Sequence, residues 1–137
     1  MDRREGVAAL QAAVTERPVP YNVDLVRAPD EEPSMITRMW RGWTRSEDAD
    51  AYHRFLLQHL FPSMCTIPGF LGADVLRRPD GTEVAFVTLT RFESLSDVRA
   101  FAGEAYEVPV LEPEALELLS RYDKRALHFE TASFVVP

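Results

Sequence analysis

Hydrophobic and polar residues follow strand-like patterns in several segments of the chain. Residues 84–92, VAFVTLTRF, are rich in the β-branched and aromatic residues that strands favour. They follow the sequence RPDGTE, whose Pro-Asp-Gly step is typical of the turn of a β-hairpin. Apolar residues are also dense in MITRMWRGW, although this segment carries arginines. We therefore expect strands over residues 35–43, 70–78, 84–92 and 125–134.

Signals for helix starts and ends lie between these strands. Ser46 is expected to cap a helix with an acidic first turn, where the helix dipole favours negative charge. Apolar residues then recur at helical spacing, and the helix should end near Pro62. Ser94 should cap a second helix that ends at Gly103. Pro113 suits the first position of a third helix, PEALELLSRY.

The resulting element order, β-α-β-β-α-α-β, predicts an α+β fold. A hairpin between two crossover helices is the split βαβ, ferredoxin-like arrangement, with a four-stranded antiparallel sheet and helices on one face. The other face also needs cover, because VAFVTLT does not alternate cleanly between apolar and polar residues. A second copy of the chain is the economical cover, so we expect a homodimer.

The first 34 residues differ from the rest in composition. A short amphipathic helix is expected over residues 4–16, and four prolines follow between residues 17 and 34. This composition predicts an extended arm. We therefore divide the chain into an N-terminal extension, residues 1–34, and a folded domain, residues 35–137.

Composition and charge argue against several classes of function and location. A length of 137 residues with 46% hydrophobic residues suits one domain with its own core. The net charge of −7 argues against nucleic-acid binding. Cys65 is the only cysteine, which excludes an intramolecular disulfide and suits a reducing cytoplasm. No apolar run is long enough to cross a membrane, and the first residues do not resemble a secretion signal.

Residues 35–134 resemble the antibiotic-biosynthesis-monooxygenase family. The resemblance rests on MITRMWRGWTRSEDADAY, on the glycine turn in IPGFLGADVLRR, and on the strand-to-helix step EVAFVTLTRFESLSDVRAF, in which Phe92 is the aromatic that precedes Ser94. It implies dimeric α+β barrels with one pocket per subunit, between the sheet and its own helices. The family includes cofactor-free oxygenases of aromatic polyketides, quinol oxygenases and haem-degrading enzymes.

Arg38 and Trp40 are the first candidates for chemistry. A two-residue period places both on one face of the first strand. A buried arginine must be paired or meet a ligand, because an isolated buried charge is costly. The alternative is that Arg38 pairs with a carboxylate such as Glu130 and that Trp40 belongs to the core. The resemblance implies a polar residue, often Asn, near Trp40, and this chain has no Asn there.

His128 is the candidate base. It shares a strand face with Glu130, and a histidine with a pKa near 6.5 can remove a phenolic proton. Deprotonation starts cofactor-free oxygenation, because an electron-rich phenolate can give one electron to O2. The alternative is a hydrogen-bonded histidine in the core or in a dimer interface.

Other residues are candidates for substrate binding: Phe92, Tyr106, His53 and His59. Phe92 and Tyr106 would line the pocket, unless Tyr106 only seals the core. His53 and His59 are six positions apart on one helix and therefore do not form a helical metal pair, and structural roles are their alternative. We predict no metal site.

Haem is not expected as a cofactor. The resemblance implies an iron-binding histidine near Leu111, but no histidine lies between His59 and His128. The sequence therefore favours a cofactor-free monooxygenase that acts on an aromatic substrate with O2, or a related cyclase or isomerase. In this hypothesis His128, Arg38 and Trp40 are catalytic. The alternative is a non-catalytic, ligand-binding or stress-associated dimer.

Overall fold

The computed structural model describes residues 34–137. Residues 34–130 belong to one compact unit, whereas residues 131–137 have no regular secondary structure and fall in a separate unit. The helix and proline-rich arm expected in the N-terminal extension lie outside the described residues. None of the described helices is both long and apolar enough to span a membrane.

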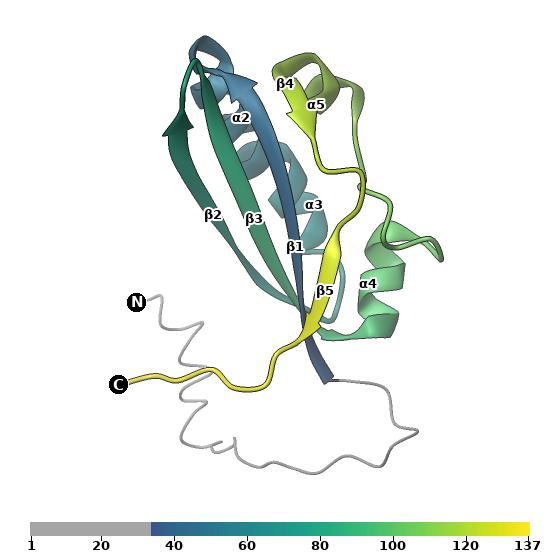
Figure 1. The fold of residues 1–137 in the computed structure, drawn as a ribbon. Coiled ribbons are helices and arrows are strands. Elements are labelled where there is room, and N and C mark those ends of the chain that lie inside the picture. Colours follow the sequence, from purple (N-terminus) through teal and green to yellow (C-terminus); the bar gives the residue numbers. More distant parts are fainter. Residues whose placement is uncertain (1–33) are drawn as a thin grey trace. The chain divides into compact units, whose positions relative to one another are not determined.

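An antiparallel sheet of five strands forms the centre of the unit (Figure 1). Strand β1 pairs with β3 on one side, and β3 pairs with β2. The other edge of β1 pairs with β4 along one part and with β5 along another. The strands are β1 (Ser34–Arg45), β2 (Phe70–Asp80), β3 (Glu83–Ser94), β4 (Leu119–Tyr122) and β5 (Leu127–Glu130). The predicted α+β, ferredoxin-like class is confirmed.

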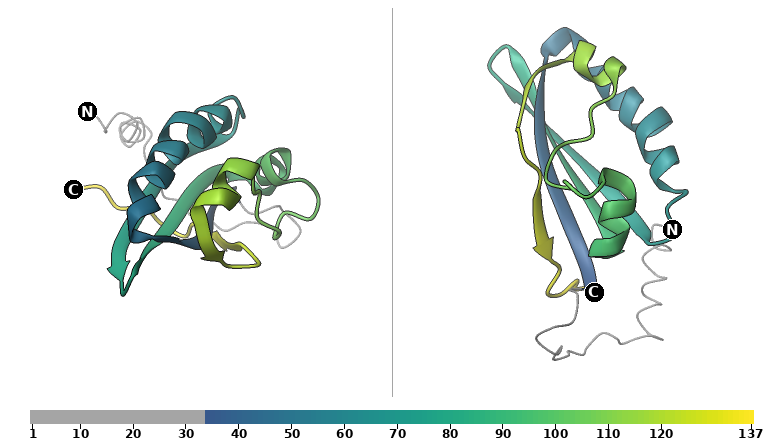
Figure 2. Two further views of the ribbon diagram at one scale, coloured as in Figure 1. Left: turned by 90° about the horizontal axis from the view of Figure 1, so that it is seen from above. Right: turned by 90° about the vertical axis from the view of Figure 1, so that its right-hand side faces the viewer.

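The helices cover one face of this sheet, as the right-hand view of Figure 2 shows. Burial alternates along β3, where every second residue from Val84 to Phe92 is buried and the residues between are half-buried. This period of two is what a strand with one covered face requires. We call the helix-covered side the inner face and the opposite side the outer face.

The first helical region extends from Ser46 to Met64 and changes its winding along the way. It consists of η1 (Ser46–Asp48), α2 (Ala49–Phe55), a π-helical segment η2 (Leu56–Leu60) and α3 (Phe61–Met64). We expected an end near Pro62, but Pro62 lies inside α3. A proline clashes with the carbonyl group four residues earlier and donates no hydrogen bond. Wider π-helical winding just before Pro62 is one way for a helix to accommodate the clash and the missing hydrogen bond.

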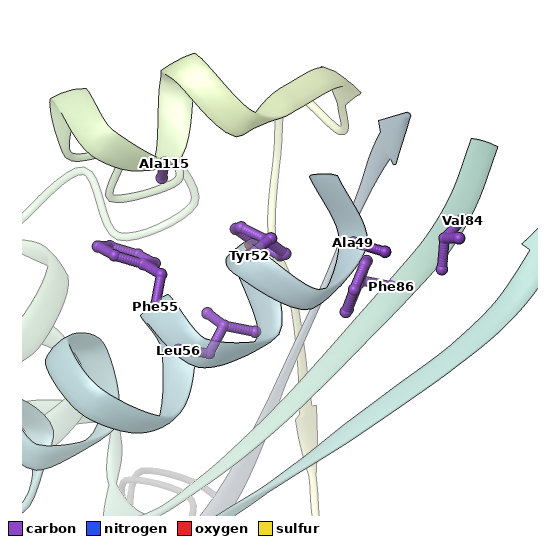
Figure 3. Close-up of a cluster of buried hydrophobic side chains, with 7 residues drawn as sticks. All are labelled: Ala49, Tyr52, Phe55, Leu56, Val84, Phe86 and Ala115. Carbon is purple, nitrogen blue, oxygen red and sulfur yellow. The ribbon is translucent and has the colours of Figure 1, made fainter. Parts of the chain in front are cut away.

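Two apolar clusters join the helices to the inner face. In the first, the rings of Tyr52 and Phe86 meet edge to face with centroids 4.9 Å apart. Its buried members are Ala49, Tyr52, Phe55, Leu56, Val84, Phe86 and Ala115 (Figure 3). The second cluster contains Ile36, Met64, Phe92 and Val98. Together they fix the helical region against β1 and β3.

The second helix, α4 (Leu95–Ala102), begins and ends as predicted. The Ser94 hydroxyl accepts a hydrogen bond from the Asp97 backbone N–H, and Gly103 follows the helix with a φ of 88°. Such a positive φ favours glycine, which has no Cβ to clash. Residues 103–112 then cross to α5 without regular structure, and we call them the connection 103–112.

The C-terminal part differs from the prediction. Helix α5 (Pro113–Leu118) ends four residues early, because Leu119 has an extended backbone and starts β4. The strand expected over residues 125–134 is only β5 (Leu127–Glu130). The edge of β1 that one predicted strand was expected to fill is therefore shared by two short strands, β4 from the end of the predicted helix and β5 from the predicted strand. Residues 119–122 pair with β1 and form a strand, because this pairing outweighs their helix propensity. The Ser120 hydroxyl also donates to the Trp43 carbonyl oxygen.

No described helix covers the outer face of the sheet (Figure 2). Strand register places Leu127 and Phe129 of β5 there, beside Met39 and Thr37 of β1. Both are half exposed, at 51% and 50%, as is Leu76 of β2 at 50%. The outer face therefore presents apolar side chains.

Candidate functional site

A small, partly open cavity lies between the inner face and the helices. Its volume is about 50 Å³, which is room for a few water molecules. Strands β1 and β3 contribute Arg38, Trp40, Thr88 and Thr90 to the wall. The remaining wall consists of apolar residues of the first helical region together with Phe101, Ala115 and residues 109–112 of the connection 103–112. The cavity is thus apolar except for a few polar groups.

Arg38 is the charged group in this wall that is most deeply buried, with 5% of its surface exposed. Its guanidinium donates to the backbone carbonyl oxygens of Tyr106, at 2.6 Å, and Val108, at 3.5 Å. It also lies over the Phe101 ring, 5.4 Å from the centroid. Burial lowers the pKa of Arg38 to about 10. No carboxylate among the described residues forms an ion pair with it; within them, backbone carbonyl oxygens, the Phe101 ring and the imidazole of His128 surround its charge.

His128 is the side-chain partner of Arg38. Strand β5 pairs with β1 so that these two residues are directly opposite, and His128 Nε2 lies 3.1 Å from Arg38 Nη1. A guanidinium can only donate, so Nε2 accepts and the ring proton is on Nδ1. Burial, and then the charge of Arg38, lower the pKa of His128 to about 4, against a smaller opposite effect of Glu107. His128 is therefore neutral at pH 7.

Tyr106 completes this group from the connection 103–112. Its ring meets that of His128 edge to face, with centroids 5.0 Å apart. Tyr106, His128, Glu107 and Arg125 line an open depression of about 420 Å³. Arg38 lines the cavity and its partner His128 lines the depression. The Arg38–His128 pair is thus part of the partition between the two.

Trp40 lies farther along the cavity wall. Its indole N–H donates to the Asp123 carbonyl oxygen at 2.8 Å, and its ring is 6.0 Å from that of Tyr122. The polar atom of Trp40 is therefore already satisfied, and its ring supplies apolar surface to the cavity.

The other three predicted residues do not line the cavity. Phe92 is fully buried and packs behind Phe101, with centroids 6.2 Å apart. His53 lies at the sheet edge, where its Nδ1 is 3.4 Å from Arg77 Nη1. His59 is exposed on η2, beside the Phe55 ring. The structure thus brings together Arg38, Tyr106 and His128, with Trp40 in the same wall as Arg38.

Two buried hydroxyl groups in the wall were missed from the sequence. Tyr52 is 2% exposed and Thr90 is 6% exposed, and both line the cavity. Neither hydroxyl forms a hydrogen bond within the described part of the chain. Burial raises the pKa of Tyr52 well above that of a free tyrosine. The two-residue period of β3 predicts the inward position of Thr90, but helical spacing indicated Tyr52 only as an apolar core residue.

A metal site is not apparent in residues 34–137, where no group of three or more His, Cys, Asp or Glu side chains is suitably arranged. The described residues that line the cavity suit an organic ligand: they carry aromatic rings, hydroxyls and one guanidinium, and the exposed Glu112 contributes to the wall as well.

Comparisons with known proteins support the fold. No family model and no curated protein matches the sequence. Among solved structures, a candidate antibiotic biosynthesis monooxygenase from Bacillus cereus aligns over 76% of this chain and 99% of its own, with 14% identity and a TM-score of 0.51. Another from Nitrosomonas europaea aligns over 73% and 92%, with 13% identity and a TM-score of 0.51. The chain therefore has the fold of these structures, as its sequence resemblance implies.

A further similar structure is SnoaB, a cofactor-independent oxygenase from Streptomyces nogalater. It aligns over 76% of this chain and 98% of its own, with 18% identity and a TM-score of 0.46. At such low identity a likeness concerns the fold alone, because one fold supports many reactions.

Proposed function

We propose that this protein is a small tailoring enzyme that oxidises an aromatic or polyketide-like molecule with O2 and without a cofactor. The observation that best supports this function is the hydrogen bond between Arg38, in the wall of the cavity, and His128, which lines the adjacent depression. A neutral imidazole beside a buried guanidinium that has no carboxylate partner among the described residues is suited to removing a proton and stabilising the oxyanion that results.

Trp40 and Phe101 would hold the ring system of the substrate through their apolar surfaces. Phe92 packs against Phe101 and would support it from behind. The cavity is far smaller than the roughly 300–1,000 Å³ of typical ligand pockets. Substrate entry therefore requires a wall to move, and the connection 103–112 is the wall without regular secondary structure.

The first chemical step would be deprotonation of a phenol by His128. Its Nε2 lone pair accepts from Arg38 in the free protein. If Arg38 turns to the substrate oxygen, Nε2 is released to accept the phenolic proton, and the guanidinium stabilises the phenolate. The phenolate then gives one electron to O2. For a substrate such as an anthrone, one oxygen atom ends in a new ring carbonyl, and the other leaves as water with two substrate hydrogens.

We further propose that the enzyme is a cytoplasmic homodimer that associates through the outer face of its sheet. The half-exposed Leu76, Leu127 and Phe129 on that face support this assignment, because a second copy would remove their apolar surface from water. The single cysteine fits a reducing compartment.

A second candidate function is ligand binding without catalysis. The same hydrogen bond favours it: the Arg38 N–H occupies the lone pair that a base would need, and a histidine with a pKa of about 4 is a weak base. In that case the cavity would hold a metabolite that is not converted.

Oxygen consumption with a panel of anthrones and hydroquinones separates the two functions. We expect uptake by the wild type and a decrease of about 10²- to 10⁴-fold for His128→Ala, the usual contribution of a general base. Lys124→Ala is the control, because this exposed residue lies in the turn before β5 and lines neither the cavity nor the depression. Equal rates for wild type and His128→Ala would refute the base assignment, and no uptake with any compound would favour binding alone.

A further inference from the structure

The wall of the cavity contains two hydroxyl groups that have no hydrogen-bond partner among the described residues, and a guanidinium that has no carboxylate partner among them. The hydroxyls of Tyr52 and Thr90 are buried and form no hydrogen bond within the described residues. Arg38 is buried in the same wall with no carboxylate partner among those residues. Buried polar groups are nearly always hydrogen-bonded, so exceptions need an explanation.

Stability alone does not explain these groups. Phenylalanine at position 52 would keep the contacts of the ring with Phe55 and Phe86 without burying a hydroxyl. Replacing an unsatisfied buried polar group with an apolar one of the same shape is neutral or stabilising. An aliphatic residue at position 38 would likewise avoid the cost of a buried charge. The two hydroxyls are therefore suited to a ligand rather than to the empty fold, whereas Arg38 holds the connection 103–112 in the free protein and also offers its charge to a ligand.

The chemistry of the groups defines the ligand. A guanidinium selects an anionic oxygen, and a carboxylate matches its planar set of donors. A phenol and an alcohol can each donate to, and accept from, a hydroxyl group. The rest of the wall is mostly apolar and includes Trp40 and Phe101; Thr88 and the exposed Glu112 are its other polar residues. These requirements together describe a flat aromatic molecule with a carboxylate and a separate hydroxyl.

We propose that the cavity binds a hydroxylated aromatic carboxylate, with Arg38 binding the carboxylate and Tyr52, assisted by Thr90, binding a hydroxyl other than the phenol that His128 would deprotonate. The inference rests on the proposed function, since it names the substrate class of the same site, and it makes Tyr52 a specificity-determining residue. The anionic oxygen takes over the guanidinium N–H groups that now reach the Tyr106 and Val108 carbonyl oxygens. Its entry thereby frees the connection 103–112 and makes room for the ring system.

Binding to three matched probes tests this assignment. Calorimetric titration of the full chain would compare 6-hydroxy-2-naphthoate with 2-naphthoate, which lacks the hydroxyl, and with 6-hydroxy-2-naphthamide, which lacks the charge. We expect the first to bind about five- to ten-fold more tightly than the second and at least ten-fold more tightly than the third. Equal affinity for all three, or no binding of any, would overturn the proposal.

The variants assign each preference to a residue. Tyr52→Phe should abolish the preference for the hydroxyl and leave the affinity for 2-naphthoate unchanged, whereas Tyr122→Phe, outside the cavity wall, should change neither. Arg38→Met should abolish the preference for the carboxylate over the amide. A Tyr52→Phe protein that weakens both naphthoates equally, or neither, would refute the role of Tyr52.

Thermal unfolding gives a second measurement that does not depend on the probes. Tyr52→Phe should raise the melting temperature of the ligand-free protein, because it removes a buried unsatisfied hydroxyl; a lower melting temperature would overturn the premise. The oxygenase proposal and the binding proposal can be refuted independently of each other. The expected binding pattern without any oxygen uptake would reject the oxygenase and keep this site, whereas oxygen uptake without the binding pattern would do the reverse.

Discussion

The positions of Arg38 and Trp40 follow from the register of one strand. Ile36 of β1 faces the inner apolar cluster, and the two-residue period then turns Arg38 inward as well. A shift by one residue would expose Ile36 and bury Thr37, so packing around Ile36 holds the guanidinium inside. Packing around Ile36 thus keeps the charge of Arg38 at the cavity.

His128 should make the stability of the protein depend on pH. Its pKa is about 4 in the folded chain, against 6.5 when unfolded. Between these values the unfolded state binds more protons, so the free energy of unfolding rises with pH in this window. The contribution of His128 is fully present above pH 6.5 and is lost as the pH falls toward 4. We expect a lower denaturation midpoint in urea at pH 5 than at pH 7.

His128→Gln is the matched variant for this prediction, because a glutamine amide oxygen can still accept from Arg38 but does not titrate. Its denaturation midpoint should change less between pH 7 and pH 5 than that of the wild type. Restricting the comparison to this range limits the effect of carboxyl groups, which titrate mainly below it. An identical pH dependence of the two proteins would show that His128 is not the responsible group.

The sequence predicted part of the site at this scale. Alternation placed Arg38, Trp40 and His128 on inner faces, and their proximity followed once β5 paired with β1. It did not predict that the partner of Arg38 is His128 rather than a carboxylate, because this depends on a register that local patterns do not fix. Nor did it identify Tyr52, since an aromatic residue at helical spacing indicates only burial.

At the scale of elements, Arg38 also anchors the connection 103–112. It donates to two backbone carbonyl oxygens of that connection. The Ala126 backbone N–H and the Arg125 side chain bind Glu107 from the other side. Few other polar contacts hold these residues, and Val108 and Val110 are exposed. The connection should therefore open more readily than the elements that flank it.

Arg38→Met should loosen this connection specifically. Loss of charge-assisted hydrogen bonds to the Tyr106 and Val108 carbonyls should raise amide exchange in residues 103–112 by about ten-fold or more. Exchange within β3 should stay unchanged. Arg41→Met is the control, because Arg41 is exposed on the outer side of the same strand and pairs with Asp123. Unchanged exchange in the connection would show that Arg38 does not anchor it.

Most elements could be predicted because their signals are local. Ser94, Gly103 and Pro113 begin or end helices through their own backbone and side-chain chemistry. The exceptions depend on distant partners. SRY, residues 120–122, has no strong local preference and becomes a strand because β1 offers an unpaired edge there. The π-helical winding of η2 likewise depends on how Pro62 is accommodated against the core.

At the scale of the whole molecule, the two faces of the sheet differ in what covers them. The inner face is covered by the molecule's own helices, which leave the small cavity between them. The outer face has apolar residues and exposed charged residues such as Arg41, which lies against Trp43. A mixed surface of this kind suits association between copies, because interfaces between proteins contain both apolar and polar residues.

We expect the purified chain to have twice its monomer mass of 15.6 kDa in solution. Leu127→Asp should shift the protein toward the monomer, because a charge at this position would be buried without a partner in the proposed interface. Leu57→Asp is matched to it: Leu57 is 53% exposed, close to the 51% of Leu127, but lies on the helical side. Light scattering over a range of concentrations distinguishes the species. A wild-type monomer at every concentration, or an equal shift in both variants, would contradict a dimer formed through the outer face.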